Sequence, residues 1–503
     1  MKRSVAFRRP SDLSLVAVLL CLIVLSGCGS PGDPSSSGSP GADPAAQRPP
    51  DILVILVDTL RASHLGLYGY PRETDPNLQR FASQATVFDH AWASAGCTFP
   101  SVNSLLTSRT PNLFLAQPEG KLGLLESTPS FVRYLRDDAG YRTLAISGSP
   151  IVRARPTRFN PAGGFEDGFE TFDEWCLWKP AECLNQRFFE RLDPLLSSAP
   201  GQSAGSPNEA DEGAESSDDR APFFAYLHYM DPHGPYDPPD HHPQSFTRPY
   251  QGKAFIVEGK PHRIAEMIYD QGGLSPQITE RDIEHLRDLY DEEIAYFDSQ
   301  LPALWAGLEK RGLMDDLLII FASDHGELFL ENGHFKHCRS TYEGLVHVPL
   351  LLRLPSGTVG EGPRRIPGPA SNIHLAPTMM DYAGLDLADY PELEGQTLRP
   401  LLEGQAEASL PSHSFTLQGT YRSVFDGRYK LLIDRKSERL ELYDLSVDPR
   451  ESQNLAQIQP EIFRRLRRAL HEHMQEVVQG RSEQLDLERA EESERQLRAV
   501  GYL

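Results

Sequence analysis

Two stretches of the chain have the pattern of strands that are buried on both faces of a sheet. Residues 317–321 form an unbroken apolar run of strand length, and residues 52–57 form another. Continuous apolar runs are typical of parallel strands that helices cover on both sides. Asp58 follows one run directly, and Asp324 with His325 follows the other closely. Because ligands bind outside the carboxyl ends of such strands, we expect chemistry at these positions.

Helical and strand patterns alternate along most of the chain. Helices are expected over residues 77–85, from residue 98 onward, and over residues 131–139 and 279–310. Pro302 is expected to kink or split the last of these. Further strands are expected at residues 86–88, 143–147, 223–227 and 348–354.

The pattern of hydrophobic and polar positions changes at about Ser412. Short alternating segments at residues 421–425, 429–433 and 440–443 indicate a small antiparallel sheet, and a helix is expected over residues 460–478. The predicted fold class is therefore α/β, with a doubly wound, mostly parallel sheet flanked by helices and a small C-terminal α+β subdomain. The catalytic domain is expected at residues 51–405, with an acidic disordered insertion at 197–220. The subdomain is expected at 406–480, followed by a charged tail at 481–503.

The N-terminus predicts export. Basic residues precede a short apolar core at residues 13–25, and Leu-Ser-Gly-Cys ends at Cys28. This looks like a bacterial lipoprotein signal at residues 1–27, with lipidation of Cys28 and a Ser/Gly/Pro-rich tether at 28–50. The apolar core is shorter than the roughly 20 residues of a membrane span. We therefore expect a protein of the bacterial cell envelope, outside the cytoplasm, held to the membrane by its lipid anchor.

The net charge and the cysteine content limit the classes of partner and the disulfides that the chain can have. The formal net charge of −22 argues against a nucleic-acid partner but not against a small anionic substrate held at a metal. Four cysteines remain after Cys21 and Cys28 are set aside, an even number that permits disulfides outside the cytoplasm. Cys176 and Cys183 are the closest pair in sequence, and we expect them to bridge.

The polar residues at the strand ends suit a metal site. Asp58, Asp324 and His325 are a mixed oxygen and nitrogen ligand set, which favours zinc or manganese, with calcium or magnesium possible. A hydroxyl is a candidate fourth ligand, since a threonine alcohol needs a metal or a base to become a nucleophile. His233 and His337 are candidates to contact the anionic group of a substrate.

A series of motifs resembles the sulfatase-type branch of the alkaline phosphatase superfamily over residues 51–455. The motifs are Ile55 to Arg61 with Leu65 to Gly69, Pro100-Ser101, Asp231-Pro232-His233, Ser323 to Glu327, His337 with Tyr342-Glu343, Val348-Pro349-Leu350 and Leu442 to Leu445. The resemblance implies one divalent metal ion on Asp58, Asp324 and His325. It places Thr98, two residues before Pro100, at the position of the nucleophile and fourth ligand. It also implies that His233 and His337, with His228 and Arg61, contact the sulfuryl or phosphoryl oxygens, and His233 is a further candidate for a catalytic role.

The nucleophile segment departs from the sulfatase pattern. Sulfatases of this type carry Cys or Ser in a Cys/Ser-x-Pro-x-Arg motif, and that residue becomes formylglycine. This chain has Thr98, with Val102 in place of the arginine, and Cys97 stands one residue too early. A threonine here is similar to the phosphoethanolamine and lipoteichoic-acid transferases of the superfamily.

We therefore expect a metal-dependent sulfatase-like hydrolase that cleaves a sulfate or phosphate ester outside the cytoplasm without formylglycine. Its substrate would be a sulfated or phosphorylated small molecule, glycan or lipid. A phospho-group transferase using Thr98 is the first alternative, and a catalytically inactive binding protein with the sulfatase fold is the second.

Overall fold

The computed structural model describes residues 48–111, 129–155, 164–197, 220–243, 245–251, 278–405, 412–416 and 420–479. The predicted signal peptide, the lipidation site Cys28, most of the tether, the interior of the acidic insertion and the charged tail lie outside these residues.

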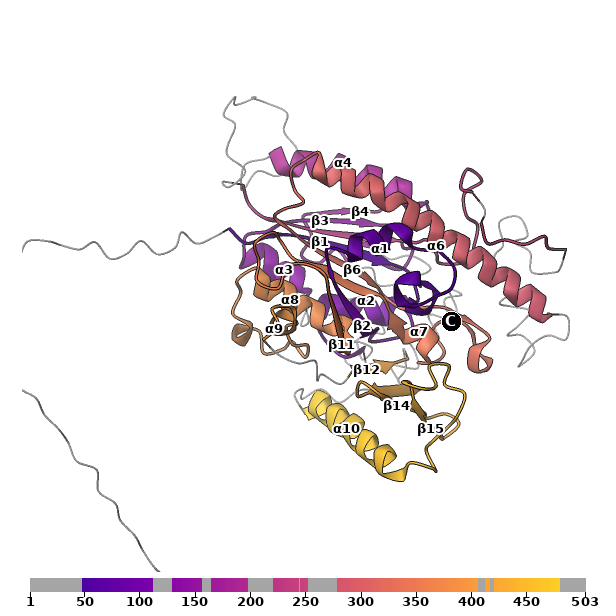
Figure 1. Cartoon of the computed structure of the whole chain (residues 1–503). Helices are drawn as coiled ribbons and strands as arrows, with labels where there is room; N and C mark the ends of the chain where they lie inside the picture. The colour runs from indigo at the N-terminus through magenta and orange to yellow at the C-terminus, as the bar shows by residue number, and fades with distance from the viewer. Residues whose placement is uncertain are drawn as a thin grey trace, which may run out of the picture. The chain divides into compact units, whose positions relative to one another are not determined.

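A sheet of nine strands forms the centre of the described part of the chain (Figure 1). Eight strands follow the order β11-β2-β10-β6-β1-β5-β3-β4, and β9 pairs with β2. The strands β6, β1, β5, β3 and β4 run parallel to one another, as do β2 and β11, whereas β10 is antiparallel to both of its neighbours. The strands are β1 (Asp51–Val57), β2 (Thr86–Trp92), β3 (Arg142–Ser147), β4 (Thr171–Asp173), β5 (Phe223–Tyr229), β6 (Leu317–Ser323), β9 (His347–Val348), β10 (Leu350–Arg353) and β11 (Arg364–Ser371).

Helices cover both faces of this sheet, as the continuous apolar runs predict. Ile52, Val54 and Leu56 of β1 face a core shared with α2, α3 and α8, while Leu53, Ile55 and Val57 face a core shared with α1, α4 and α6. The helices are α1 (Pro76–Ala82), α2 (Thr98–Thr107), α3 (Phe131–Asp137), α4 (Ala181–Ser197), α6 (Glu280–Glu309), α7 (Glu343–Val346), α8 (Leu375–Tyr382) and α9 (Arg399–Leu402). The doubly wound, mostly parallel fold is confirmed.

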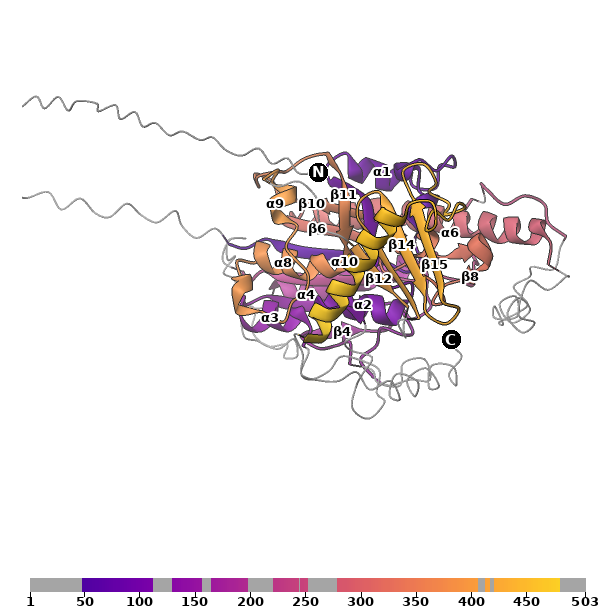
Figure 2. The same cartoon turned by 90° about the horizontal axis from the view of Figure 1, so that it is seen from below.

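The C-terminal subdomain is a four-stranded antiparallel sheet under one long helix (Figure 2). Its strands are β12 (Ser412–Phe415), β13 (Tyr421–Phe425), β14 (Tyr429–Asp434) and β15 (Arg439–Asp444), and its helix is α10 (Pro460–Gln479). Leu466 and Leu470 of α10 pack against Val424 and Leu431 of the sheet. A two-stranded hairpin, β7 (Leu328–Phe329) with β8 (Phe335–Lys336), lies apart from both sheets.

Two prolines lie within elements that the sequence predicts. Pro302 does not split α6, which continues for 30 residues because Leu301, Leu304 and Leu308 stay buried on either side of it. The single strand expected at residues 348–354 is instead two strands, β9 and β10, interrupted at Pro349. Proline has no backbone N–H to give to the ladder, so the break falls there.

The predicted Cys176–Cys183 disulfide is present, and a second one joins Cys97 to Cys338. Among the described helices, none has the length and apolar character that crossing a bilayer requires.

Candidate active site

The carboxyl ends of three neighbouring parallel strands bring the predicted acidic residues together. β1 lies between β5 and β6, with Val57 opposite Tyr229 on one side and Ser323 on the other. Asp58 and Asp324 are the next residues after β1 and β6, so both carboxylates leave the sheet at the same edge. The backbone N–H of Asp58 donates to the Tyr229 carbonyl at 2.9 Å, which fixes the first turn after β1.

Asp58, Asp324 and His228 form a group whose ligand atoms all lie within 4.8 Å of one another. His228 Nε2 is 3.3 Å from Oδ2 of Asp58. His325 lies beside this group, with Nε2 3.7 Å from Oδ1 of Asp58 and 3.5 Å from Oδ2 of Asp324. The structure therefore brings together the predicted ligands and also places His228, expected to contact substrate, against the carboxylates.

The electrostatics of this group suit a bound cation. Burial raises the pKa of Asp58 to about 7 and raises the pKa of Asp324, which is also close to Asp58. Oδ1 of Asp58 and Oδ2 of Asp324 are buried and have no hydrogen-bond partner among the described residues. Burial also lowers the pKa of His228 to about 4 and that of His325 well below its usual range, so both imidazoles are neutral and could serve as ligands. Buried carboxylates with open lone pairs next to neutral imidazoles are the donor set of a divalent metal site.

Thr98 meets this group at the N-terminus of α2. It is the first residue of the helix, as predicted, and its side chain is almost fully buried. Its Oγ1 lies 3.1 Å from Nε2 of His325. The other ring nitrogen of His325, Nδ1, donates to the Gly326 carbonyl at 2.8 Å, so Nε2 of the neutral ring carries the lone pair. The Thr98 hydroxyl therefore donates its proton toward His325.

His337 forms the second part of the site. Its ring lies 4.8 Å from that of His325 and 5.2 Å from that of His233. His337 Nδ1 is 2.9 Å from Oε1 of Glu327, whose other oxygen accepts from the Tyr236 hydroxyl at 2.8 Å. Burial opposes protonation of His337, but the charge and hydrogen bond of Glu327 outweigh it and raise the pKa.

His233 differs from His337 in charge. Burial, with the nearby charge of His337, lowers the pKa of His233 to about 3. Its Nδ1 donates to the Gly234 carbonyl at 2.7 Å, so the neutral ring presents a lone pair at Nε2. The surroundings therefore favour protonation of His337 over protonation of His233.

Arg61 is turned mainly toward the protein. Its guanidinium donates to Ser63 Oγ, to the Glu327 carbonyl and to Glu331 Oε1 at 2.7, 2.8 and 2.9 Å. These bonds fix the backbone at Glu327 and so support the partner of His337. The substrate contact expected for Arg61 stays a prediction.

The sequence does not predict two contacts of the site, that of Glu327 with His337 and the disulfide of Cys97 with Cys338. Glu327 lies inside the recognised motif without an assigned role, and Cys97 and Cys338 are the two cysteines for which the sequence predicts no partner. The adjacency of Cys97 to Thr98 and of Cys338 to His337 was the available signal, but their pairing depends on the fold.

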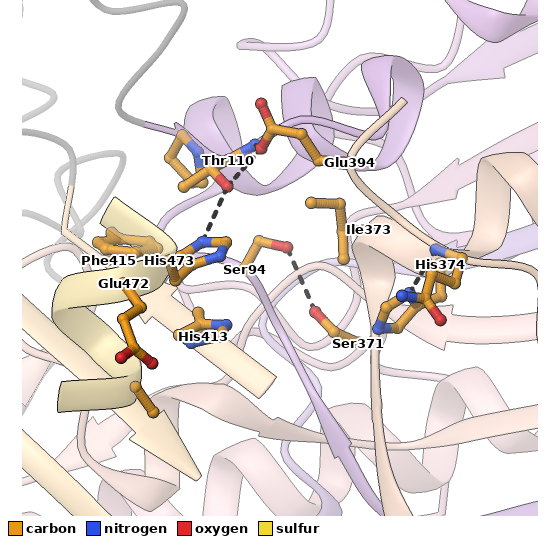
Figure 3. A pocket seen from close by; sticks show the side chains of 13 residues that line it. Ser94, Thr110, Ser371, Ile373, His374, Glu394, His413, Phe415, Glu472 and His473 are labelled. Atoms are coloured by element: carbon orange, nitrogen blue, oxygen red, sulfur yellow. Dashed lines mark hydrogen bonds between the residues drawn. The ribbon is translucent and has the colours of Figure 1, made fainter. Parts of the chain in front are cut away.

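A separate cavity of about 360 Å³ lies between α10 and the body of the protein (Figure 3). His374, His413 and His473 line it with Glu394 and other residues, and the rings of His413 and His473 are stacked 3.8 Å apart. None of the residues proposed for catalysis or metal binding lines this cavity.

Comparison with known proteins identifies the relatives of this chain. The sequence model described as Sulfatase matches residues 50–385, and the one described as N-sulphoglucosamine sulphohydrolase, C-terminal, matches residues 331–480. The choline-sulfatase of Rhizobium meliloti (strain 1021) is 25% identical over 448 residues, which cover 81% of this chain and 82% of that protein.

Two solved structures are similar to this one. A protein in complex with its substrate, D-glucosamine-2-N,6-O-disulfate, matches with a TM-score of 0.63 and 17% identity, covering 86% of this chain and 99% of that one. A phosphonate monoester hydrolase of Agrobacterium radiobacter matches with a TM-score of 0.59 and 22% identity, covering 86% and 96% of the two chains. At these identities the structures show a shared fold.

Proposed function

This chain belongs to the sulfatase family, and from that premise we propose that it hydrolyses a sulfate ester with Thr98 as nucleophile beside one divalent metal ion. The observation that carries the proposal is the 3.1 Å contact between Thr98 Oγ1 and His325 Nε2, directly next to two buried carboxylates. An alcohol beside a base and a cation site is the arrangement that nucleophilic catalysis by threonine requires.

Asp58, Asp324 and His228 would hold the ion, with Thr98 as a further ligand, because the lone pair of His325 Nε2 already accepts from the Thr98 hydroxyl. When bound, the ion would offset the two buried carboxylates and attract the negative charge of the reacting group. The ligand types favour zinc or manganese, with calcium and magnesium as alternatives.

The chain itself orients the nucleophile. His325 Nε2 receives the hydrogen bond of Thr98, which leaves an oxygen lone pair of the hydroxyl free to attack. Because Thr98 begins a helix of ten residues, the backbone N–H groups of the first turn also favour negative charge at this position. Both effects promote attack on sulfur by the hydroxyl oxygen.

His337 is assigned to the sulfuryl oxygens. Its protonated ring, held by Glu327, donates to an oxygen whose charge grows during the displacement. His233 lies beside it and presents an unprotonated Nε2, so we place it next to the incoming water, from which it can accept a proton, while the leaving oxygen takes its proton from solvent. Water then releases the Thr98 ester, which completes hydrolysis.

A sulfated small molecule or glycan is the substrate class that the relatives support, since one is a choline-sulfatase and another was solved with a disulfated glucosamine. Phospho-group transfer is the second candidate. The observation that favours it is the threonine at the nucleophile position together with Val102 in place of the arginine. The retained pair of buried carboxylates argues against an inactive binding protein.

A substrate panel decides among these functions. Purified protein, stripped and then reloaded with zinc, manganese, calcium or magnesium, is assayed on an aryl sulfate, choline sulfate, a glucosamine sulfate, an aryl phosphate and a phosphodiester. Each assay is run with and without an alcohol acceptor. We expect hydrolysis of a sulfate ester without acceptor. Turnover only of phosphoesters with acceptor would establish the transferase, and no turnover with any metal would leave the binding protein.

We also propose that the body of the protein is exported and anchored through Cys28, as the N-terminal sequence indicates. Two disulfides among the described residues support an oxidising compartment. In cell fractionation the full chain is expected with the membrane and the Cys28→Ala chain in the soluble fraction. Equal membrane retention of both would contradict the lipid anchor.

A further inference from the structure

The two segments that carry Thr98 and His337 are joined to each other covalently. Cys97 directly precedes Thr98, Cys338 directly follows His337, and the two cysteines form a disulfide across 241 residues of sequence. Both are buried. The backbone N–H of Cys338 also donates to the carbonyl of Gly96, at 2.6 Å, so two kinds of bond connect the same two segments.

The two segments also approach each other closely at Gly96, next to the disulfide. A Cβ atom added to Gly96 would lie only 2.8 Å from the carbonyl oxygen of Ser340, so no larger residue fits there without displacing the backbone. The segment that carries Thr98 is therefore shaped to receive the segment that carries His337.

His337 has little regular structure of its own to hold it. The strand before it, β8, is two residues long. Its neighbours Lys336 and Cys338 both have left-handed backbone conformations, with φ of 62° and 73°. Non-glycine residues adopt this conformation only where the surroundings impose it, at a cost in free energy. The disulfide and the bond to Gly96 are such constraints on the Cys338 side.

We propose that Cys97–Cys338 is a positioning disulfide, which fixes the His337 imidazole relative to the Thr98 hydroxyl so that both act on one substrate group. The inference rests on the proposed function, because that function gives Thr98 and His337 their roles. It assigns Cys97 a use other than conversion to an aldehyde, since its sulfur is engaged in the disulfide. Cys97 and Cys338 each stand one residue from Thr98 and His337, and we assign them no chemical step, so they are expected to act through these neighbours.

The test compares two disulfides in one protein. The Cys97→Ser/Cys338→Ser variant is expected to lose about 10- to 100-fold in kcat, because misplacement of a catalytic group by about 1 Å has an effect of this size. Its metal content is expected to equal that of the wild type. The control is Cys176→Ser/Cys183→Ser, which opens the other disulfide. Trp178, inside the control loop, lies edge-on to His233, so a small change in kcat is allowed for, and the kcat of the control is expected to stay within twofold of the wild type.

A redox titration opens the Cys97–Cys338 disulfide without substituting either cysteine. The Cys176→Ser/Cys183→Ser protein keeps Cys97–Cys338, and a dithiol reductant converts this disulfide to two thiols while itself forming a disulfide. Loss of activity is expected to follow the alkylation of Cys97 and Cys338 measured by mass spectrometry, and reoxidation is expected to restore it. All assays are run below the unfolding midpoint of each protein, so that lost stability is not read as lost catalysis.

A second readout does not need turnover. Orthovanadate binding, measured by calorimetry, is expected to be at least about tenfold weaker in Cys97→Ser/Cys338→Ser than in the wild type, because the two halves of the anion site no longer keep their distance. A folded variant with unchanged kcat and unchanged vanadate affinity would overturn the proposal. If the wild type turns over no ester, the proposed function fails, and the vanadate comparison alone then decides whether the disulfide positions the site.

Discussion

The hydroxyl oxygen of Thr98 lies 3.1 Å from Nε2 of His325, although 227 residues separate them in the sequence. β6 leads into Asp324 and His325, and α2 begins at Thr98, so the contact depends on the packing of a helix against the end of a central strand. Ser101 Oγ strengthens this packing by donating to the Asp324 carbonyl. The nucleophile and its acceptor are thus held by the core of the protein.

Removing the hydroxyl should abolish turnover. Thr98→Ala is expected to lower kcat at least about 10³-fold, because no other group supplies the attacking oxygen. Thr98→Ser keeps that oxygen and should retain kcat to within about tenfold. Thr107→Ala, which removes another buried hydroxyl of the same helix, is the matched control and should leave kcat unchanged. Steady-state kinetics on the best sulfate ester measure all three, and normal turnover by Thr98→Ala would refute the assignment.

Asp324→Asn should separate metal binding from folding. Oδ1 of Asp324 accepts from the backbone N–H groups of Thr59 and His325, at 3.2 and 2.8 Å, and asparagine preserves both bonds. The lost charge is expected to weaken metal binding more than about 100-fold. In a chelator, however, the variant should unfold at a higher temperature than the wild type, because it no longer places a second carboxylate beside Asp58.

Metal analysis and thermal unfolding with and without chelator measure these two effects of Asp324→Asn. Full metal content in the variant would remove Asp324 from the ligand set.

The charge of Glu327 should matter only through His337. Glu327→Gln keeps a hydrogen-bonding side chain but loses the charge that holds the imidazole protonated. The inhibition constant of inorganic sulfate is expected to rise about tenfold, since a cationic donor to the anion is weakened. In a His337→Gln background the same substitution should add almost nothing. Additive effects in this double-mutant cycle would show that Glu327 acts on something else.

Acid should destabilise the protein through the histidines of the cavity in Figure 3. Burial lowers the pKa of His374 and of His473 to about 4, against about 6.5 in the unfolded chain. The unfolded state therefore binds more protons between these values. The contribution of these neutral rings to stability is complete above about pH 6.5 and is lost as the pH falls toward 4.

Thermal unfolding across this pH range checks the effect. His473→Gln should flatten the dependence of the midpoint on pH between 6.5 and 4. His471→Gln, at an exposed position on the same helix, should not. Equal slopes in both variants would contradict the assignment.

The central fold could be predicted because its strands are buried on both faces. Residues 52–57 and 317–321 contain no polar residue, so they fit only the middle of a sheet that helices cover on both faces. The places of Asp58 and Asp324 follow from that. The proline positions were harder to predict, because the effect of Pro302 depends on whether the flanking leucines remain packed.

The partners within the site could not be predicted from the sequence. His228 meets Asp58 because the register of β5 against β1 sets Leu56 opposite it, and no local pattern encodes that register. The pairs Glu327–His337 and Cys97–Cys338 likewise depend on loops that come together only in three dimensions. Motifs located these residues along the chain, and the tertiary structure determined which ones touch.

The position of β1 also has a consequence for biosynthesis. Among the described residues, the first strand to leave the ribosome lies in the middle of the sheet, between two partners that are synthesised much later. Until β5 and β6 have emerged, the apolar segment 52–57 has no native neighbour and remains a target for chaperones or for aggregation. A nascent chain that stops before residue 317 can therefore form neither the sheet nor the site, and maturation has to wait for translation to pass that point.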